Sequence, residues 1–300
     1  MSTQESRVQI FEQQKQVVDC YYRGVDAHIS DWESAFAWIH TYPLQTLDAI
    51  LGPAPQRILT LGDGRGALES RYLKALGHDA IPGDVCVDNL RNAKEAGLID
   101  EYLELNAENL DLPDRSFDFV LMKEALHHLQ RPYLGIYEML RVAKKGLILL
   151  EPHREYPHTI TACLKEISRR LLRREGSEGN ARLPTVKYES IGNYLYFFSA
   201  YEFTQSALAL GITDVAFRFC HRPYEHGDDC SLKGDELKRF IRRRKIRMMF
   251  QDLLKGRQRR PVLCYAMFKS ALTQEQKSRL MASGYDVPQL KLNPLLQKVA

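Results

Sequence analysis

Three glycines at alternating positions, Gly62, Gly64 and Gly66, follow a short apolar run at residues 57–61. A strand that runs into closely spaced glycines and then a helix brings backbone N–H groups close to a ligand. The spacing is G-x-G-x-G, whereas dinucleotide sites use G-x-G-x-x-G. Asp63 within the turn would be unfavourable beside a pyrophosphate, but acceptable beside a ligand with ammonium and sulfonium charges. The alternative interpretation is an ordinary tight turn.

Strand-like and helix-like segments alternate after this turn. The pattern predicts strands at residues 57–61, 79–85, 101–105, 117–122 and 146–150, and helices at 68–76, 89–96 and 133–142. Such alternation predicts an α/β fold in which helices cover both faces of a parallel sheet. Farther along, a capping-box-like start at Ser199 predicts a helix to residue 210, and strands are expected at 215–220 and 262–268. Ligands bind such sheets beyond the carboxyl ends of the strands.

The chain is expected to form one main core with additions. The predicted divisions are an N-terminal helical region 1–56, a ligand-binding core 57–151, a lid or acceptor insertion 152–199, a C-terminal part of the core 200–270 with a basic helical insertion 231–260, and a tail 271–300. The lid is rich in aromatic side chains that could stack on a ring or sugar, or simply cap the sheet. These are Tyr156, Tyr188, Tyr194, Tyr196, Phe197 and Phe198.

Composition excludes several classes of protein. The hydrophobic fraction of 44% and charged fraction of 27% are those of a globular protein. No apolar run approaches the length of a membrane span, and the N-terminus lacks the apolar stretch of a signal peptide. The six cysteines are far apart and form no C-x-x-C pair. We therefore expect a cytoplasmic protein with no metal site and no disulfide framework.

The positive charge of the chain is concentrated in one segment. The whole chain carries +4, whereas residues 235–260 contain eleven Lys or Arg and three acids. Apolar residues at helical spacing within it, at 246, 249, 250 and 253, predict a helix. Its cations could attract phosphate on a nucleotide-linked sugar, a lipid-linked glycan, a membrane surface or RNA, or could form a solvated helix face. The cations considered are Arg242, Arg243, Arg244, Lys245 and Arg247.

Two further features lie at informative distances from the glycine turn. Asp84 ends the second predicted strand, 18 residues after Gly66, where a carboxylate can accept hydrogen bonds from both ribose hydroxyls. The stretch N-A-E-N-L-D-L-P-D-R-S-F-D at residues 106–118 then leads into the fourth strand, followed by K-E-A-L-H-H-L and E-M-L-R-V-A-K-K-G-L-I-L-L-E-P. Here the chain resembles the class I S-adenosylmethionine-dependent methyltransferases, whose pattern runs D-A-E-x-L-P-F-x-D-x-S-F-D. The resemblance covers residues 57–152, with a weaker echo through residue 268.

The resemblance implies a Rossmann-like fold and S-adenosylmethionine as cofactor. It places the glycine turn at the amino-acid end of the cofactor, Asp84 at the ribose, residues 106–108 at the adenine and Lys123 with Glu124 near the methionine part. The expected cofactor-binding residues are Leu61, Gly62, Asp63, Gly64, Gly66, Asp84, Val85, Asn106, Ala107, Glu108, Lys123 and Glu124.

Three positions depart from the family pattern. Thr60 stands where an acid is usual, Asp63 where a small residue or cysteine is usual, and Asn106 where an aspartate is usual. Thr60 removes a carboxylate that commonly helps to orient the cofactor amine, and Asp63 could replace it. Asn106 can still accept from the adenine amino group but carries no charge. Weakened or lost cofactor binding is therefore one hypothesis for this chain.

Candidate catalytic residues follow the fourth and fifth strands. His127 and His128 follow the fourth, and Glu151 and His153 the fifth, so all four lie at the expected cofactor edge. A base is needed when the methyl acceptor must lose a proton, and histidine titrates near neutral pH. The alternative is that these residues pack, cap a helix or anchor a loop.

The leading hypothesis is a methyltransferase that uses S-adenosylmethionine and acts on a small molecule or a saccharide at oxygen, with an anionic acceptor suiting the basic segment. A second is methylation of RNA or protein, with the basic segment as docking surface. Nothing in the chain resembles an RNA-binding module such as an RRM or KH domain. A third is a methyltransferase-like fold that has lost catalysis and binds a partner. The sequence leaves the oligomeric state open.

Overall fold

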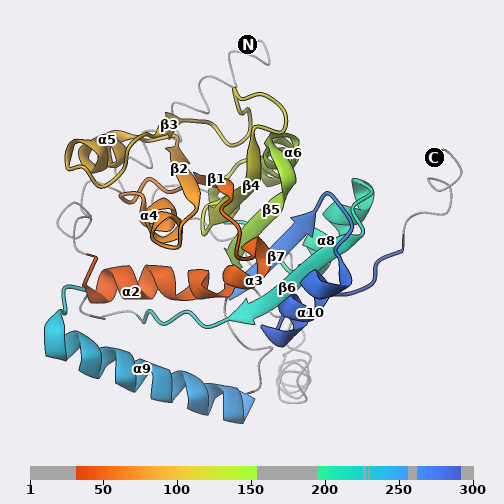
Figure 1. Cartoon of the computed structure of the whole chain (residues 1–300). Helices are drawn as coiled ribbons and strands as arrows, with labels where there is room; N and C mark the ends of the chain where they lie inside the picture. Colours follow the sequence, from red (N-terminus) through yellow and green to blue (C-terminus); the bar gives the residue numbers. More distant parts are fainter. Residues whose placement is uncertain (1–31, 154–194, 226–227, 229, 256–261, 292–300) are drawn as a thin grey trace, which may run out of the picture.

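The computed structural model describes residues 32–153, 195–225, 228, 230–255 and 262–291. In this part, one sheet carries helices on both faces, and a long helix near residues 234–255 lies outside them, alongside the first described helix (Figure 1). Several predicted features lie outside the described residues. They are the first 31 residues of the predicted N-terminal helical region, three aromatics of the predicted lid (Tyr156, Tyr188 and Tyr194) and the end of the tail. None of the described helices is long and apolar enough to cross a membrane.

Seven strands form the sheet in the order β3-β2-β1-β4-β5-β7-β6. They are β1 (Arg57–Leu61), β2 (Asp79–Asp84), β3 (Leu103–Glu104), β4 (Phe117–Lys123), β5 (Ala143–Pro152), β6 (Asp214–Cys220) and β7 (Val262–Phe268). The first five pair in parallel, and Leu61 at the end of β1 is in register with Gly83 and Met122. All seven predicted strands are confirmed, although β3 has only two residues and β5 begins earlier than expected.

Strand β7 is antiparallel to both neighbours, so the predicted parallel sheet holds only for β1 to β5. After β5 the chain continues through α8 (Ala200–Ala209) to β6, which does not pair with β5. Strand β7 then lies between β5 and β6 and runs in the opposite direction to both. All residues of β7 are buried, as its apolar sequence V-L-C-Y-A-M-F requires.

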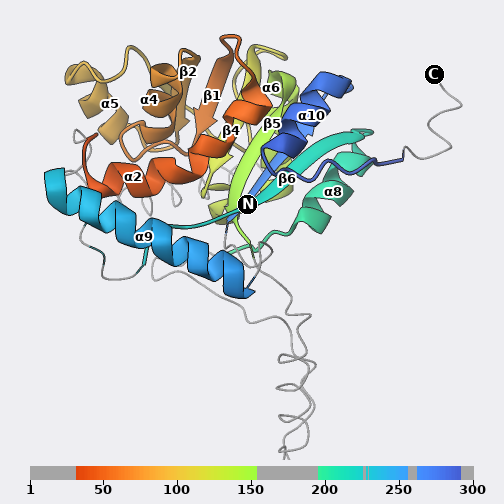
Figure 2. The same cartoon turned by 60° about the horizontal axis from the view of Figure 1, so that its bottom comes forward.

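Helices cover both faces of the sheet because successive side chains of each strand point to opposite sides. On one face, α6 (Pro132–Val142) and α8 pack Ile136 and Phe203 into the core with the side chain of Leu59. On the other, α3 (Asp48–Leu51), α4 (Leu68–Ala75) and α10 (Gln274–Ala282) pack apolar side chains against Ile58. Figure 2 shows these helices around the sheet, with α5 (Asp88–Glu95) beside α4.

Helices at the two ends of the described chain meet on this second face. The N-terminal region contains α2 (Ala35–Thr41), a 3-10 turn η2 (Tyr42–Thr46) and α3, so its described part is helical as predicted. Helix α10 has no counterpart in the predictions, although a capping box between Thr273 and Gln276 marks its start. Arg279 of α10 donates from Nε to the carbonyl of Ala49 at 3.0 Å, which ties α10 to α3.

Candidate active site

A cavity of about 650 Å³ lies at the carboxyl ends of β1, β2, β4 and β5. The strand-end residues Leu61, Asp84, Lys123 and Pro152 line it. Further walls come from α2, from the 3-10 turn η3 (Leu126–His128), from residues 195–197 and from the loop that leads to helix α9 (Gly234–Lys255). This is the edge of the sheet at which the α/β pattern predicts a ligand.

The glycine turn brings the backbone against the cavity. Gly62 has a φ of 78°, and its N–H donates to the carbonyl of Gly83 at 2.9 Å. A Cβ at Gly62 would lie 2.4 Å from the Cβ of Ala125, so the turn and the loop after β4 are in close contact. Only glycine satisfies both the backbone conformation and this approach.

Gly62→Ala should therefore destabilise the fold by about 2–4 kcal/mol, since a positive φ and an overpacked contact each contribute. Gly97→Ala is the matched control, because Gly97 also has a positive φ of 69° but no atom lies within 4 Å of the place that a Cβ would occupy there. The control should lose only about 1–2 kcal/mol. Urea unfolding of both variants measures the difference, and equal losses would show that the contact with Ala125 is unimportant.

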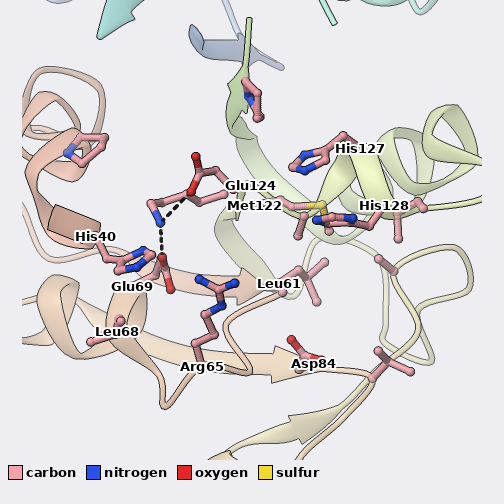
Figure 3. Close-up of a pocket in the computed structure, with 18 of the residues that line it drawn as sticks. His40, Leu61, Arg65, Leu68, Glu69, Asp84, Met122, Glu124, His127 and His128 are labelled. Carbon is pink, nitrogen blue, oxygen red and sulfur yellow. Dashed lines mark hydrogen bonds and ion pairs between the residues drawn. The ribbon is translucent and has the colours of Figure 1, made fainter. Parts of the chain in front are cut away.

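Asp84 lies at the end of β2 with only 4% of its surface exposed. Its carboxylate accepts from the N–H of Gly64 at 2.8 Å and from the N–H of Cys86 at 2.9 Å. Burial raises the pKa of Asp84 to about 6, against the opposing effect of these backbone donors. The carboxylate thus connects the glycine turn to the end of β2 and borders the cavity (Figure 3).

Asp63 is directed away from the cavity, toward the start of α4. It accepts from the Thr60 hydroxyl at 2.8 Å and from the N–H groups of Glu69 at 3.1 Å and Ser70 at 2.9 Å. Burial and then the nearby Glu69 carboxylate raise the pKa of Asp63 well above its usual value. Thr60 and Asp63, the two departures from the family pattern in β1 and its turn, therefore form one buried hydrogen-bonded unit that supports the helix N-terminus.

A line of alternating charges forms one wall of the cavity. Lys123 Nζ lies 2.9 Å from Glu69 Oε1 and 3.9 Å from Glu124 Oε2 (Figure 3). Glu124 Oε1 in turn lies 3.2 Å from Arg222 Nη2. Burial disfavours ionisation of Glu69, but the Lys123 ammonium and the hydrogen bonds with Asp63 and Lys123 together outweigh it and lower the pKa of Glu69 to about 2. Glu124 has a φ of 49°, which is uncommon outside glycine and frequent at functional sites.

Arg65 and His40 add two nitrogen-bearing side chains that the sequence patterns did not single out. Arg65 stands between Gly64 and Gly66, and its side chain extends toward the middle of the cavity between Glu69 and Asp84 (Figure 3). His40 comes from α2, and burial, then Lys123 and Arg65, lower its pKa to about 3. The location of Arg65 inside the glycine turn was a usable signal, whereas His40 and Glu69 carried none.

His127 and Glu151 form a pair at the opposite side of the cavity. His127 Nδ1 lies 2.5 Å from Glu151 Oε2, and Glu151 is fully buried. The other carboxylate oxygen of Glu151 accepts from the N–H groups of Ala125 at 3.1 Å and Leu126 at 2.9 Å. A carboxylate at Nδ1 favours the tautomer with its proton there, which makes Nε2 the basic nitrogen.

His128 also lines the cavity, with its ring centroid 4.0 Å from that of His127. Burial and then the His127 charge lower the pKa of His128 to about 3, so its imidazole is neutral. His153 lies outside the lining, with its ring 4.7 Å from that of Phe219.

The predicted site residues divide into two groups. Those that line the cavity are Leu61, Gly62, Asp84, Val85, Asn106, Ala107, Lys123, Glu124, His127 and His128. Those that do not line it are Asp63, Gly64, Gly66, Glu108, Glu151 and His153. Glu108, for example, accepts from the backbone N–H and the Nε of Arg131, at 2.8 and 2.6 Å. Asn106 Oδ1 accepts from the N–H of Glu108 at 2.9 Å, which shapes the loop after β3.

The predicted lid aromatics that the structure describes have different roles. Tyr196 and Phe197 line the cavity, and Tyr196 donates from its hydroxyl to the carbonyl of Gln130 at 3.0 Å. Phe198 is buried in the core and stacks on Phe203 at 5.1 Å between ring centroids. Phe198 therefore fits the interpretation as a hydrophobic cap, whereas stacking of Tyr196 and Phe197 on a ring or sugar stays a prediction.

A doubly wound sheet with a glycine turn, a buried acid after β2 and a cavity at the strand ends defines a Rossmann-like domain with a nucleotide-type cofactor site. Residues 59–150 match the family model described as a methyltransferase domain. This part of the chain is a class I methyltransferase domain, the class that uses S-adenosylmethionine as methyl donor.

Curated relatives match the same part of the chain. The ubiquinone/menaquinone biosynthesis C-methyltransferase UbiE of Vibrio cholerae is 29% identical over 119 residues, 35% of this chain and 45% of the relative. An uncharacterized methyltransferase of Mycobacterium tuberculosis is 33% identical over 106 residues, 35% of this chain and 43% of the relative. The chain thus spans less than half the length of these relatives.

Solved structures share the fold over most of the chain. The Burkholderia thailandensis 1,6-didemethyltoxoflavin-N1-methyltransferase, with bound 1,6-didemethyltoxoflavin and S-adenosylhomocysteine, has a TM-score of 0.52 at 14% identity and covers 90% of this chain and 92% of its own. A putative Haloferax volcanii methyltransferase in complex with the activator Trm112 has a TM-score of 0.52 at 12% identity and covers 87% and 99%. At these identities the likeness extends to the fold alone.

Proposed function

We propose that the protein transfers a methyl group from S-adenosylmethionine to a small-molecule or saccharide acceptor, at oxygen. One observation carries this proposal: a single cavity joins the glycine turn and Asp84 to the His127–Glu151 pair. A cofactor held at the first two would present its methyl group within the same cavity as a histidine suited to act as a base.

The residues of the cavity fit the proposed cofactor. Asp84 offers carboxylate oxygens to the ribose hydroxyls, and Asn106 with Ala107 lies on the adenine side. The amino-acid end of the cofactor carries both an ammonium and a carboxylate, and the cavity wall offers charges of both signs. Glu69 and Glu124 would face the ammonium, and Arg65 the carboxylate. In this assignment Glu69 and Glu124, and not Asp63, take the place of the acid that is usual at the position of Thr60.

The chain's own residues would act mainly by alignment and by proton removal. When bound, S-adenosylmethionine supplies an electrophilic methyl group on a sulfonium. His127 Nε2 would take the proton from the acceptor hydroxyl as that oxygen accepts the methyl group, for which the cofactor would supply a neutral thioether as the leaving group. Glu151 stabilises the imidazolium that forms and fixes the orientation of the ring.

The cavity and its lining favour a small acceptor over a macromolecule. Tyr196 and Phe197 line the cavity and provide apolar faces on which a sugar or an aromatic ring could lie. Arg222, paired with Glu124, borders the same space and would favour an anionic acceptor. The alternatives of RNA or protein methylation, or of a partner-binding protein without catalysis, are tested by the following experiment.

Calorimetric titration of the protein with S-adenosylmethionine and S-adenosylhomocysteine tests the cofactor assignment. Micromolar binding of both would support it, and an acceptor screen of saccharides and phosphorylated small molecules would follow, read by mass spectrometry as the addition of one methyl group. Absence of binding of either ligand would overturn the proposal in favour of a partner-binding protein. Methylation of RNA or protein alone would overturn the choice of acceptor.

Cofactor affinity should fall as the pH is lowered through the pKa of Asp84, about 6. The pKa of this carboxyl is raised in the folded protein, so it is ionised above pH 6 and protonated below it. Only the ionised form accepts from both ribose hydroxyls, and affinity at pH 5 should be about tenfold lower than at pH 7. Calorimetry at a series of pH values measures this, and Asp84→Asn should flatten the profile. An unchanged affinity across this range would contradict the proposed role.

A further inference from the structure

Helix α9 (Gly234–Lys255) turns one side toward the protein and the other toward solvent (Figures 1 and 2). On the inner side, Met248 is buried, and Phe240 packs edge-on against Trp38 of α2 at 6.0 Å between ring centroids. His221 Nε2 also lies 2.9 Å from Asp252 Oδ1. These contacts fix which face of the helix is exposed.

The exposed face carries apolar side chains that the core does not require. Ile246 is 43% exposed, Met249 60%, Phe250 52% and Leu253 79%. Their spacing of i, i+3, i+4 and i+7 places them together on one stripe of the helix. An exposed apolar cluster of this kind commonly marks an interaction surface.

Arginines continue the same stripe toward the start of the helix. Arg239, Arg242 and Arg243 precede Ile246 by seven, four and three residues, and all three are exposed. On the same helical periodicity they lie on the face of Ile246 and Phe250. The outer face of α9 therefore consists of a basic half followed by an apolar half.

The cations on the inner and outer sides of α9 differ in their ion pairs. Arg244, directed inward, pairs with Glu225 and Asp228, and the flanking Arg247 lies 2.7 Å from Glu225. By contrast, Arg242 and Arg243 have no acidic side chain within 4 Å among the residues that the structure describes. On the outer face, Arg239 lies 3.9 Å from Glu236 of the first turn, whereas Arg242 and Arg243 remain available to an anionic partner.

We propose that the outer face of α9 binds an anionic phospholipid surface. Its arginines would contact lipid phosphates, and Ile246, Met249, Phe250 and Leu253 would enter the boundary between headgroups and acyl chains. RNA would satisfy the arginines but would leave four apolar side chains in water. A second copy of the chain would bring arginine clusters against each other or against apolar side chains. Only a surface with phosphates above an apolar layer matches both halves.

The surface adjoins the candidate active site. The N–H of Phe36 donates to the carbonyl of Cys230 at 3.0 Å, and that of Ala35 to Leu232 at 2.9 Å, so the segment before α9 is held against the start of α2. Phe36 and Cys230 line the cavity. Docking through α9 would therefore place the cavity close to the lipid surface. The proposal itself does not depend on the proposed function.

Flotation of the full chain with lipid vesicles tests this inference without any cofactor. We expect binding to phosphatidylcholine vesicles that contain phosphatidylglycerol and little binding to phosphatidylcholine alone. R242E/R243E should lower partitioning at least about thirtyfold, since each basic residue near an anionic surface contributes about fivefold. F250S/L253S should lower it at least about tenfold through loss of the inserted side chains. Both variants change exposed side chains and should keep the melting temperature.

Matched control variants separate this surface from general charge and hydrophobicity. K94E/K144E reverses two exposed lysines of α5 and β5, and L76S/M281S removes two apolar side chains that are 43% and 52% exposed. Both controls should bind vesicles as the parent does. Equal loss in the controls, no vesicle binding, or binding of RNA or self-association through α9 in place of lipid would overturn the proposal.

Discussion

Glu151→Gln should lower kcat by about 10²–10⁴-fold, the range expected for loss of a general base, while leaving the affinity for S-adenosylmethionine unchanged. The substitution keeps a carbonyl oxygen to accept from the N–H groups of Ala125 and Leu126. The new amide NH₂ group, however, would donate to Nδ1 of His127. The proton would then move to Nε2, and the nitrogen that faces the acceptor could no longer take one.

His127→Ala should reduce kcat to a similar extent, because both changes remove the same base. Glu138→Gln is the matched control, since Glu138 also accepts from a backbone N–H, that of Leu110 at 2.8 Å, and pairs with a cation, Arg141. The control should keep full activity with the acceptor found in the screen. NMR of ¹⁵N-labelled histidine should show the proton of His127 on Nδ1 in the parent and on Nε2 in Glu151→Gln. A fully active Glu151→Gln variant would exclude this role.

Asp84→Ala should weaken the binding of S-adenosylmethionine and S-adenosylhomocysteine by at least about 100-fold, because two hydrogen bonds from the ribose to a buried carboxylate would be lost, each contributing about 1.5–3 kcal/mol. The N–H groups of Gly64 and Cys86 would also lose their acceptor, which would loosen the glycine turn. Both effects act on the same end of the cofactor, so the loss should appear in affinity.

Calorimetric titration measures this loss, and Asp79→Ala serves as the control at the exposed start of the same strand. Its carboxylate lies 3.7 Å from Arg57, far from the carboxyl ends of the strands, and its removal should leave the affinity unchanged. Asp84→Asn retains the side-chain volume and one acceptor oxygen, and should fall between the two. Parent-like affinity in Asp84→Ala would contradict the ribose assignment and leave the cavity without its proposed anchor.

Much of the architecture was predictable because its signals are local. The run at residues 57–61, the glycines after it and the apolar spacing from Leu68 lie next to one another in the chain. The capping box at Ser199 likewise marked the start of α8, and the structure confirms it. The antiparallel direction of β7 had no such signal, because its sequence is equally apolar in either direction and its neighbours are distant in the chain.

In the candidate site, too, the location of the residues was predictable but their contacts were not. That Asp84, His127 and Glu151 would gather at one edge followed from strand order, since the carboxyl ends of parallel strands meet there. The orientation of each side chain did not follow. Asp63 seemed suited to a cofactor amine, but the unpaired N–H groups at the start of α4 and the Thr60 hydroxyl direct it inward.

The sequence by itself thus determined the α/β fold, the methyltransferase class and the edge of the sheet where chemistry is expected, because these depend on patterns within single elements. Only the tertiary structure decided which side chains meet. Lys123 pairs with Glu69 across 54 positions of the chain, and Glu124 with Arg222 from a distant loop. A buried charge takes whichever partner the packing brings within reach, and that choice is made in space and not along the chain.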